Sequence, residues 1–182
     1  MNNILYSFLY AWAKLHGVLP MRILYILSDL FYIIIYKLVG YRLKVVRKNM
    51  KKSFPDKSAE ELKKLEQEFY HHFCDYVVET LKLSHISLEE VQRRAYLSNP
   101  ELVDDLMEKG HTTFILLMGH YGNWEWFSAS SSRFKSARVY QIYRPLTNLA
   151  FDRLFVYLRT RFGSLGIKKN DTIRDIMKLK QD

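Results

Sequence analysis

This chain of 182 residues lacks several features that would narrow its class. Its sole cysteine, Cys74, excludes an internal disulfide and fits a reducing compartment. It has no P-loop, dinucleotide-binding fingerprint, calcium-loop pattern or zinc-type spacing of cysteine and histidine, so we expect neither a metal nor a cofactor. Repeats and low-complexity segments are absent, as are the basic start and small-residue cleavage site of a secretory signal.

The composition is that of a folded, basic protein. Apolar residues make up 48% of the chain, which excludes a disordered class, and the length allows one domain plus an appendage. The formal charge of +9 and the pI near 9.5 predict an anionic partner or surface. Nucleic acid, an acidic carrier protein, phospholipid and phosphorylated glycolipid all satisfy that requirement.

Residues 4–41 are the most hydrophobic part of the chain, and Gly17 and Pro20 divide them. The run at 23–36 is shorter than the roughly 20 apolar residues that cross a bilayer, and it contains Asp29. Tyrosine and tryptophan are frequent here, as they are at lipid interfaces. We therefore predict a membrane-embedded or interfacial helix, or a shallow helical hairpin, over residues 1–41. The alternative is a pair of amphipathic helices buried in a soluble core.

A basic stretch follows directly, with no acid before Asp56. Next to an apolar anchor, such a stretch suits the anionic headgroups of a cytoplasmic membrane face. A solvated helix face or a nucleic-acid surface is the competing interpretation, but the adjacent apolar segment favours lipid, so we expect no nucleic-acid partner. The basic residues are Arg42, Lys44, Arg47, Lys48, Lys51 and Lys52.

The middle of the chain is predicted to be helical, and residues 42–98 are assigned to a basic stretch and helical subdomain. Ser58 and Glu61 form a capping box that opens a long helix ending near Leu83, and Ser87 with Glu90 forms a second one. The histidines of the long helix lack a metal-ligand pattern and are expected on its surface.

From Asn99 the pattern becomes alternating helix and strand, which predicts an α/β fold with a mostly parallel sheet flanked by helices. The chain ends without a closing element, so we expect residues 99–182 to be the N-terminal part of a truncated core. The predicted helices run from Pro100 to Gly110, from Asn123 to about Phe134, from Asn148 through Arg161 and from about Thr172, and the predicted strands cover 112–118, 137–142 and the vicinity of Ile167.

The stretch Met118–Trp126 is the best candidate for chemistry. His120 lies in a glycine-flanked turn after an apolar run, and Asn123 is a suitable N-cap for the helix that carries Glu125. In that context the histidine and the carboxylate can converge as a general base and its orienting partner. Because no serine or cysteine accompanies them in a nucleophile-elbow pattern, we expect His120 to activate a substrate hydroxyl directly.

Arginines supply the remaining candidates. Arg144 follows the next predicted strand and would emerge at the same sheet edge as His120, where it suits a phosphate or an oxyanion. Arg159 and Arg161 lie near the end of the following predicted helix, where either a ligand role or the helix dipole explains them.

Two blocks carry a resemblance to a known family. Gly119–Glu125, in which four positions separate the histidine from the acid, and Tyr143-Arg144-Pro145 resemble the bacterial lipid A biosynthesis (lauroyl/myristoyl) acyltransferases. Those enzymes belong to the lysophospholipid acyltransferase-like superfamily. The similarity extends upstream to Arg47-Lys48-Asn49 and Ser53-Phe54-Pro55, and downstream to Asn148, Arg159 and Arg161.

The resemblance implies an enzyme that transfers a fatty acyl chain from acyl carrier protein, or from acyl-CoA, to a hydroxyl of a lipid A precursor. It places the enzyme on the cytoplasmic face of the inner membrane, with a glycerolipid acyltransferase-like core. It makes His120 and Glu125 the catalytic pair and Asn123, Arg144, Arg159 and Arg161 substrate-binding residues. Related members acylate mannosylated phosphoinositides, and the family's later Asp-Gln block is absent here. Another glycolipid acceptor and a degenerate, non-catalytic membrane-binding relative therefore stand as alternatives.

Overall fold

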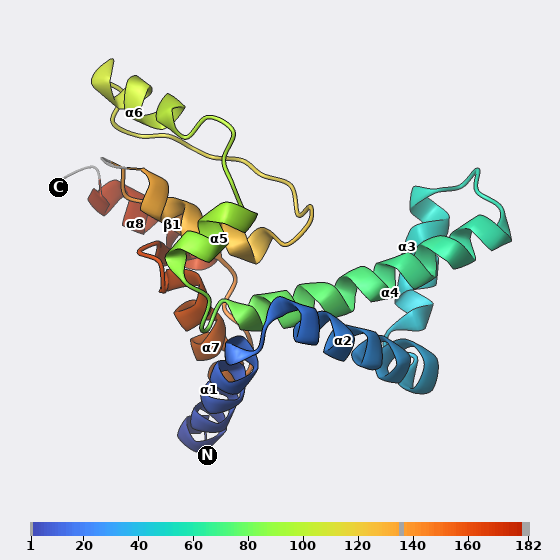
Figure 1. The fold of residues 1–182 in the computed structure, drawn as a ribbon. Helices are drawn as coiled ribbons and strands as arrows, with labels where there is room; N and C mark the ends of the chain where they lie inside the picture. Colours follow the sequence, from blue (N-terminus) through green and yellow to red (C-terminus); the bar gives the residue numbers. More distant parts are fainter. Residues whose placement is uncertain (1, 135–136, 180–182) are drawn as a thin grey trace. The chain divides into compact units, whose positions relative to one another are not determined.

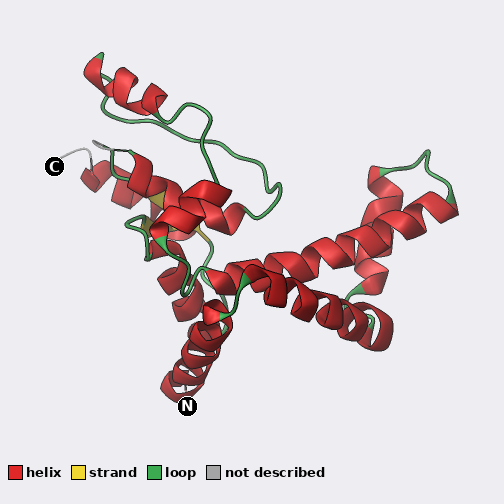
Figure 2. Ribbon diagram, viewed as in Figure 1, coloured by secondary structure: helices red, strands yellow, loops and turns green. Residues whose placement is uncertain are grey.

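The computed structural model describes residues 2–134 and 137–179, and it is mostly helical (Figures 1 and 2). The chain divides into two compact units. One comprises residues 19–81, and the other combines residues 1–18 with 82–182. The three-part functional division predicted above stays a prediction.

The unit of residues 19–81 is built only from helices. They are α2 (Met21–Tyr32), which continues as the π-helix η1 (Ile33–Val39), then α3 (Leu43–Ser53) and α4 (Ala59–Lys82), whose last residue lies beyond the unit boundary. Its core gathers aromatic rings from α2, η1 and α4 around Cys74: Tyr32, Tyr36 and Tyr70. The predicted capping box is confirmed, because the Ser58 N–H donates to Glu61 Oε2 (2.8 Å) and the Glu61 N–H to Ser58 Oγ (3.2 Å).

No single described helix is long and apolar enough to cross a membrane, whereas the pair Met21–Val39 and Leu43–Ser53, bent by 97°, has the length and composition of a crossing segment. The bend has a backbone cause. Gly40 (φ 65°) and Arg42 (φ 54°) both adopt the left-handed conformation, which ends one helix and turns the chain before the next.

The second unit begins with α1 (Asn2–Val18), which packs against α7 (Leu149–Thr160). Asn148 caps α7 as predicted, its side chain accepting from the Ala150 N–H at 3.0 Å. The other elements of this unit are α5 (Leu88–Arg94), α6 (Glu101–Glu108), the 3₁₀-helix η2 (Trp124–Arg133), β1 (Tyr140–Tyr143), β2 (Leu165–Lys168), the 3₁₀-helix η3 (Lys169–Asp171) and α8 (Thr172–Leu179).

The sheet consists of two parallel strands among the described residues. Tyr140 pairs with Leu165 and Tyr143 with Lys168, and α7 connects the strands in a βαβ unit, as the alternating pattern indicates. The parallel pairing and the helices at 100–110 and from Asn148 are thus confirmed. The predicted continuation of the last helix to Asp182 lies outside the described residues.

The predicted strand at 112–118 is wrong, and with it the larger flanked sheet. Residues 111–123 form a long loop in which Ile115 and Leu117 are 85% and 88% exposed. An apolar run records only a tendency to be buried, whereas a strand also needs a neighbour for its backbone hydrogen bonds. The helix predicted from Asn123 exists as a 3₁₀-helix, and Asn123 caps it by accepting from the Glu125 N–H at 3.3 Å.

Candidate active site

His120 lies at the surface, near the end of the loop that leads into η2. Its ring and the Trp124 ring pack in a T-shaped arrangement, with the ring centres 4.8 Å apart. Gly122, at φ 59°, makes the turn between the two. The imidazole is therefore exposed to solvent and contacts an aromatic ring on one side.

Glu125 is buried in the first turn of η2, and its side chain is only 3% exposed. Its carboxylate accepts two hydrogen bonds from Arg159 on α7, from Nε to Oε2 at 2.7 Å and from Nη2 to Oε1 at 2.6 Å. This fork geometry is the strongest arrangement for a carboxylate and a guanidinium, because two parallel charge-assisted bonds fix both groups.

Arg159 is itself held by its surroundings at the end of α7. Its guanidinium lies over the Phe155 ring, 5.2 Å from the ring centre. Its carbonyl accepts from Ser164 Oγ at 2.5 Å, and Ser164 Oγ in turn accepts from Gln141 Nε2 of β1 at 2.8 Å. These bonds tie the end of α7 to the first strand of the sheet.

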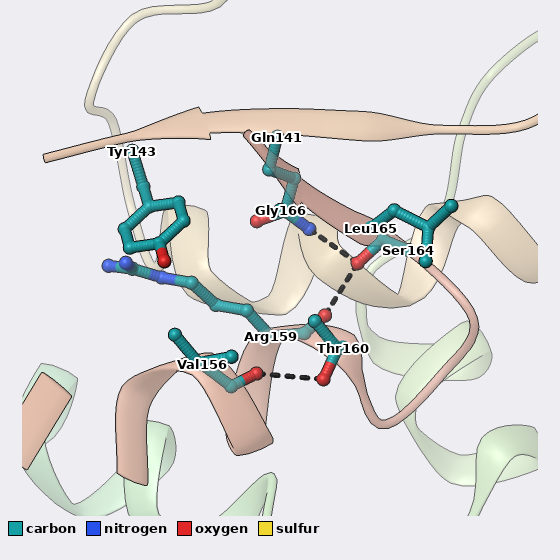
Figure 3. A pocket seen from close by; sticks show the side chains of 8 residues that line it. All are labelled: Gln141, Tyr143, Val156, Arg159, Thr160, Ser164, Leu165 and Gly166. Carbon is teal, nitrogen blue, oxygen red and sulfur yellow. Dashed lines mark hydrogen bonds between the residues drawn. The ribbon is translucent and has the colours of Figure 1, made fainter. Parts of the chain in front are cut away.

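A small cavity adjoins this arginine, and Figure 3 shows the Arg159 side chain extending toward Tyr143 inside it. Its free volume is about 10 Å³, which is room for one water molecule and not for an acyl chain. Gly166 forms part of the wall, and a Cβ there would lie 3.0 Å from Cε1 of Tyr143. The glycine thus allows the tyrosine ring to close over the strand.

The other predicted arginines lie elsewhere. Arg144 follows β1, is exposed, and has no ion pair among the described residues. Arg161 donates through Nη1 to the carbonyls of Leu83 (2.6 Å) and Ile86 (2.7 Å), so its guanidinium holds the turn after α4. The structure therefore brings together Glu125 and Arg159, and the contact of His120 with Glu125 stays a prediction.

Comparison with known families identifies the chain. A sequence model described as bacterial lipid A biosynthesis acyltransferase matches residues 2–182. The chain belongs to this family. No curated protein and no solved structure matches it. The resemblance carried by the Gly119–Glu125 and Tyr143–Pro145 blocks is confirmed.

Membership of the lipid A acyltransferase family implies an acyl donor and a lipid A precursor as acceptor. Lipid A acyltransferases are associated with the inner membrane, which agrees with the apolar and basic segments read from the sequence.

For this member of the lipid A acyltransferase family, the sequence pattern did not predict the arginine partner of the candidate acid, Glu125. Glu125 and Arg159 are 34 positions apart and belong to different helices, so no local pattern connects them. The sequence pattern also did not predict that Gln141 and Ser164 hold the end of α7, because these residues too are far apart in the chain. The only available signal was the acid in the first turn of one helix and the arginine in the last turn of another, and the helix dipole explains both.

Proposed function

We propose that this chain is a membrane-associated O-acyltransferase that transfers a fatty acyl group from an acyl carrier protein thioester to a hydroxyl of a lipid A precursor. It works at the cytoplasmic face of the inner membrane. The observation that carries the proposal is the family match over residues 2–182, together with the histidine and glutamate of the Gly119–Glu125 block.

His120 acts as the general base. It removes the proton of the acceptor hydroxyl, and the oxygen attacks the thioester carbonyl to give a tetrahedral oxyanion. The intermediate then expels the carrier thiol, which recovers its proton from the imidazolium, and the ester product forms without a covalent enzyme intermediate. The exposure of the His120 ring supports this role, because both substrates must reach one nitrogen.

Glu125 orients the imidazole and stabilises its charged form. An ionised carboxylate offers about four acceptor positions, and the two Arg159 bonds use one on each oxygen. Because a carboxylate oxygen can accept more than one hydrogen bond, the pairing with Arg159 is compatible with a further bond from a ring N–H of His120. Arg159 fixes the carboxylate so that it presents the same oxygen at every turnover, which is the orientation that general-base catalysis requires.

Arg144 binds the anionic part of a substrate or the developing oxyanion. Its side chain is exposed beside the end of β1 and has no carboxylate partner among the described residues, so its charge is available to a ligand. Asn123 contributes by holding the start of η2 in place through its cap on the Glu125 N–H.

The test is acyl transfer by the natural protein, supplied with acyl carrier protein thioester and an under-acylated lipid A precursor, followed by mass spectrometry of the lipid. We expect His120→Ala to reduce turnover by about 10²- to 10⁴-fold. The matched control is His111→Ala, since His111 is an exposed histidine of the same loop, and it should retain activity.

Parallel reactions with acyl-CoA and with a mannosylated phosphoinositide acceptor define donor and acceptor. If the His120→Ala variant kept wild-type turnover, His120 would not be the general base. Protein that bound vesicles but transferred acyl groups to no acceptor would instead be a non-catalytic relative.

A further inference from the structure

The helix formed by α2 and η1 is buried on one face and apolar on the opposite, exposed face. Its buried positions Leu24, Ser28 and Tyr32 recur every four residues and face the inside of the unit. On the opposite side lies an outward stripe at spacings of three and four, whose members are 43–67% exposed. We call this set the apolar stripe: Ile23, Ile26, Leu30 and Ile33.

A cationic face follows the apolar stripe on the next helix. Lys44, Lys48 and Lys51 recur at spacings of four and three along α3 and are exposed, and we call them the lysine face. Among the described residues none of them has an acidic partner within ion-pair distance, whereas Arg47 of the same helix is committed to Glu66 at 2.6 Å. The lysine face therefore carries charge that the unit does not neutralise.

The charge around these helices is strongly one-sided. Between Met21 and Ser53 the sequence holds eight lysines and arginines and a single acid, Asp29. An apolar stripe beside an excess of cations is the pattern of a helix that lies in a lipid interface and binds anionic headgroups. A second copy of this chain would bring the same cations together, which disfavours self-association through this surface.

Helix α2 runs beside α4 (Figure 1), and polar side-chain contacts tie α2 and η1 to α4 along their length. Tyr25 Oη donates to Glu79 at 2.8 Å, Tyr36 Oη donates to Glu66 at 2.8 Å, and His71 Nδ1 lies 3.8 Å from Asp29. If α2 and η1 crossed the bilayer, these acids would have to enter its core or lose their partners. Acids at that depth are rare because they are costly.

The bend between the two helices also favours an orientation in the plane of the membrane. Two helices that meet at 97° cannot both run along the bilayer normal, but both can lie in the plane of its surface. Left-handed backbone at Gly40 and Arg42 fixes that angle locally, and straightening it would require rebuilding both residues.

We propose that residues 19–81 form an in-plane docking surface for an anionic bilayer, in which the apolar stripe enters one leaflet and the lysine face binds lipid phosphates. This inference rests on the proposed function in one respect only, namely that the protein works at a membrane. Its test needs no acyl donor, so failure of docking and failure of acyl transfer are seen separately.

The experiment measures binding of the natural protein to vesicles of phosphatidylcholine alone and of phosphatidylcholine mixed with phosphatidylglycerol. Ile26→Asn combined with Leu30→Asn should weaken binding to both vesicle types, by about tenfold for each side chain. Leu102→Asn is the matched control, because Leu102 is 49% exposed and Leu30 is 50% exposed. Both variants alter exposed positions, and circular dichroism checks that they fold.

The lysine face is tested by Lys44→Gln combined with Lys48→Gln. Binding to the anionic vesicles should fall by roughly 30-fold, and binding to the neutral vesicles should not change. The control is Lys57→Gln combined with Lys64→Gln, which removes the same charge from lysines that pair with Glu61 and Glu68. Equal losses in the two double variants would overturn the assignment of the lysine face.

Orientation is tested with cysteines introduced as Arg22→Cys and Asn49→Cys in vesicle-bound protein. An impermeant maleimide should label both from the side of addition, and Cys74, which is fully buried, gives the background. Labelling of only one site means that the segment crosses the bilayer, which overturns the in-plane arrangement. A stripe variant that converts a dimer to a monomer while binding vesicles normally would show that a second copy covers the stripe.

Discussion

Replacing Arg159 by alanine tests the ion pair at the centre of the candidate site. The change leaves the Glu125 carboxylate, whose side chain is 3% exposed, without two bonds of 2.6 and 2.7 Å. Removing one member of a buried ion pair costs about 3–5 kcal/mol, because the remaining charge stays desolvated. Arg159 keeps 24% of its side-chain exposure, so water already screens part of the attraction. We therefore expect a loss of about 3 kcal/mol in the free energy of unfolding.

Companion variants separate the pair from the side chains. Arg159→Lys keeps the charge but not the fork of donors, and should cost about half as much. In a double-mutant cycle, Glu125→Ala combined with Arg159→Ala should destabilise the protein by about 2 kcal/mol less than the sum of the single changes. The control is Arg174→Ala, since Arg174 pairs with Asp171 and Asp175 at the surface and should cost less than about 1 kcal/mol.

The assay is urea unfolding followed by circular dichroism, with the midpoint compared at an unchanged slope. Additive single changes, agreeing with the double variant within about 0.5 kcal/mol, would refute the reasoning. They would mean that the fork contributes no coupling and that Arg159 does not hold Glu125 in place.

Two further predictions concern stability. The Arg47 guanidinium, with help from Lys63 and Tyr36, lowers the pKa of buried Glu66 from 4.5 to about 2. The charged form is favoured by folding, so this contribution of roughly 3 kcal/mol is present above pH 4.5 and is lost as the pH falls toward 2. The stability difference between wild type and Glu66→Gln should therefore shrink over that window in urea titrations, and a constant difference would contradict the assignment. Gly17→Ala should destabilise the protein by about 1–3 kcal/mol despite better helix propensity, because the new Cβ would lie 2.4 Å from Ser84 Oγ. Thermal melting measures this change, and an alanine variant as stable as wild type would show that the turn after α4 can yield.

Local signals predicted local structure well. Both hydrogen bonds of the Ser58 and Glu61 capping box form, and Asn148 caps its helix, because each contact needs only residues within one helical turn. The β1–α7–β2 unit follows from the alternation of strand and helix patterns for a similar reason. Contacts between residues that are close in the chain can therefore be predicted from the sequence alone.

Predictions that needed a distant partner failed or stayed open. The apolar run at 112–118 has the composition of a strand but forms a loop, since its backbone has no neighbouring strand in the described structure. The role of Arg161 as a substrate ligand stays a prediction, and its Nη1 donates to two backbone carbonyls 78 and 75 positions earlier in the chain. Nothing in the sequence near Arg161 indicates that contact.

The sequence by itself determined the family, the helix starts capped by Ser58 and Asn148, and the placement of His120 in a glycine-flanked turn ahead of Glu125. Each of these depends on residue types at short, fixed spacings. Only the tertiary structure decided that Glu125 pairs with Arg159, and that an apolar stripe faces outward from a helix whose other side is already packed. These features depend on which side chains meet after the chain folds back on itself. A local sequence pattern does not indicate how close two residues 34 positions apart lie in space.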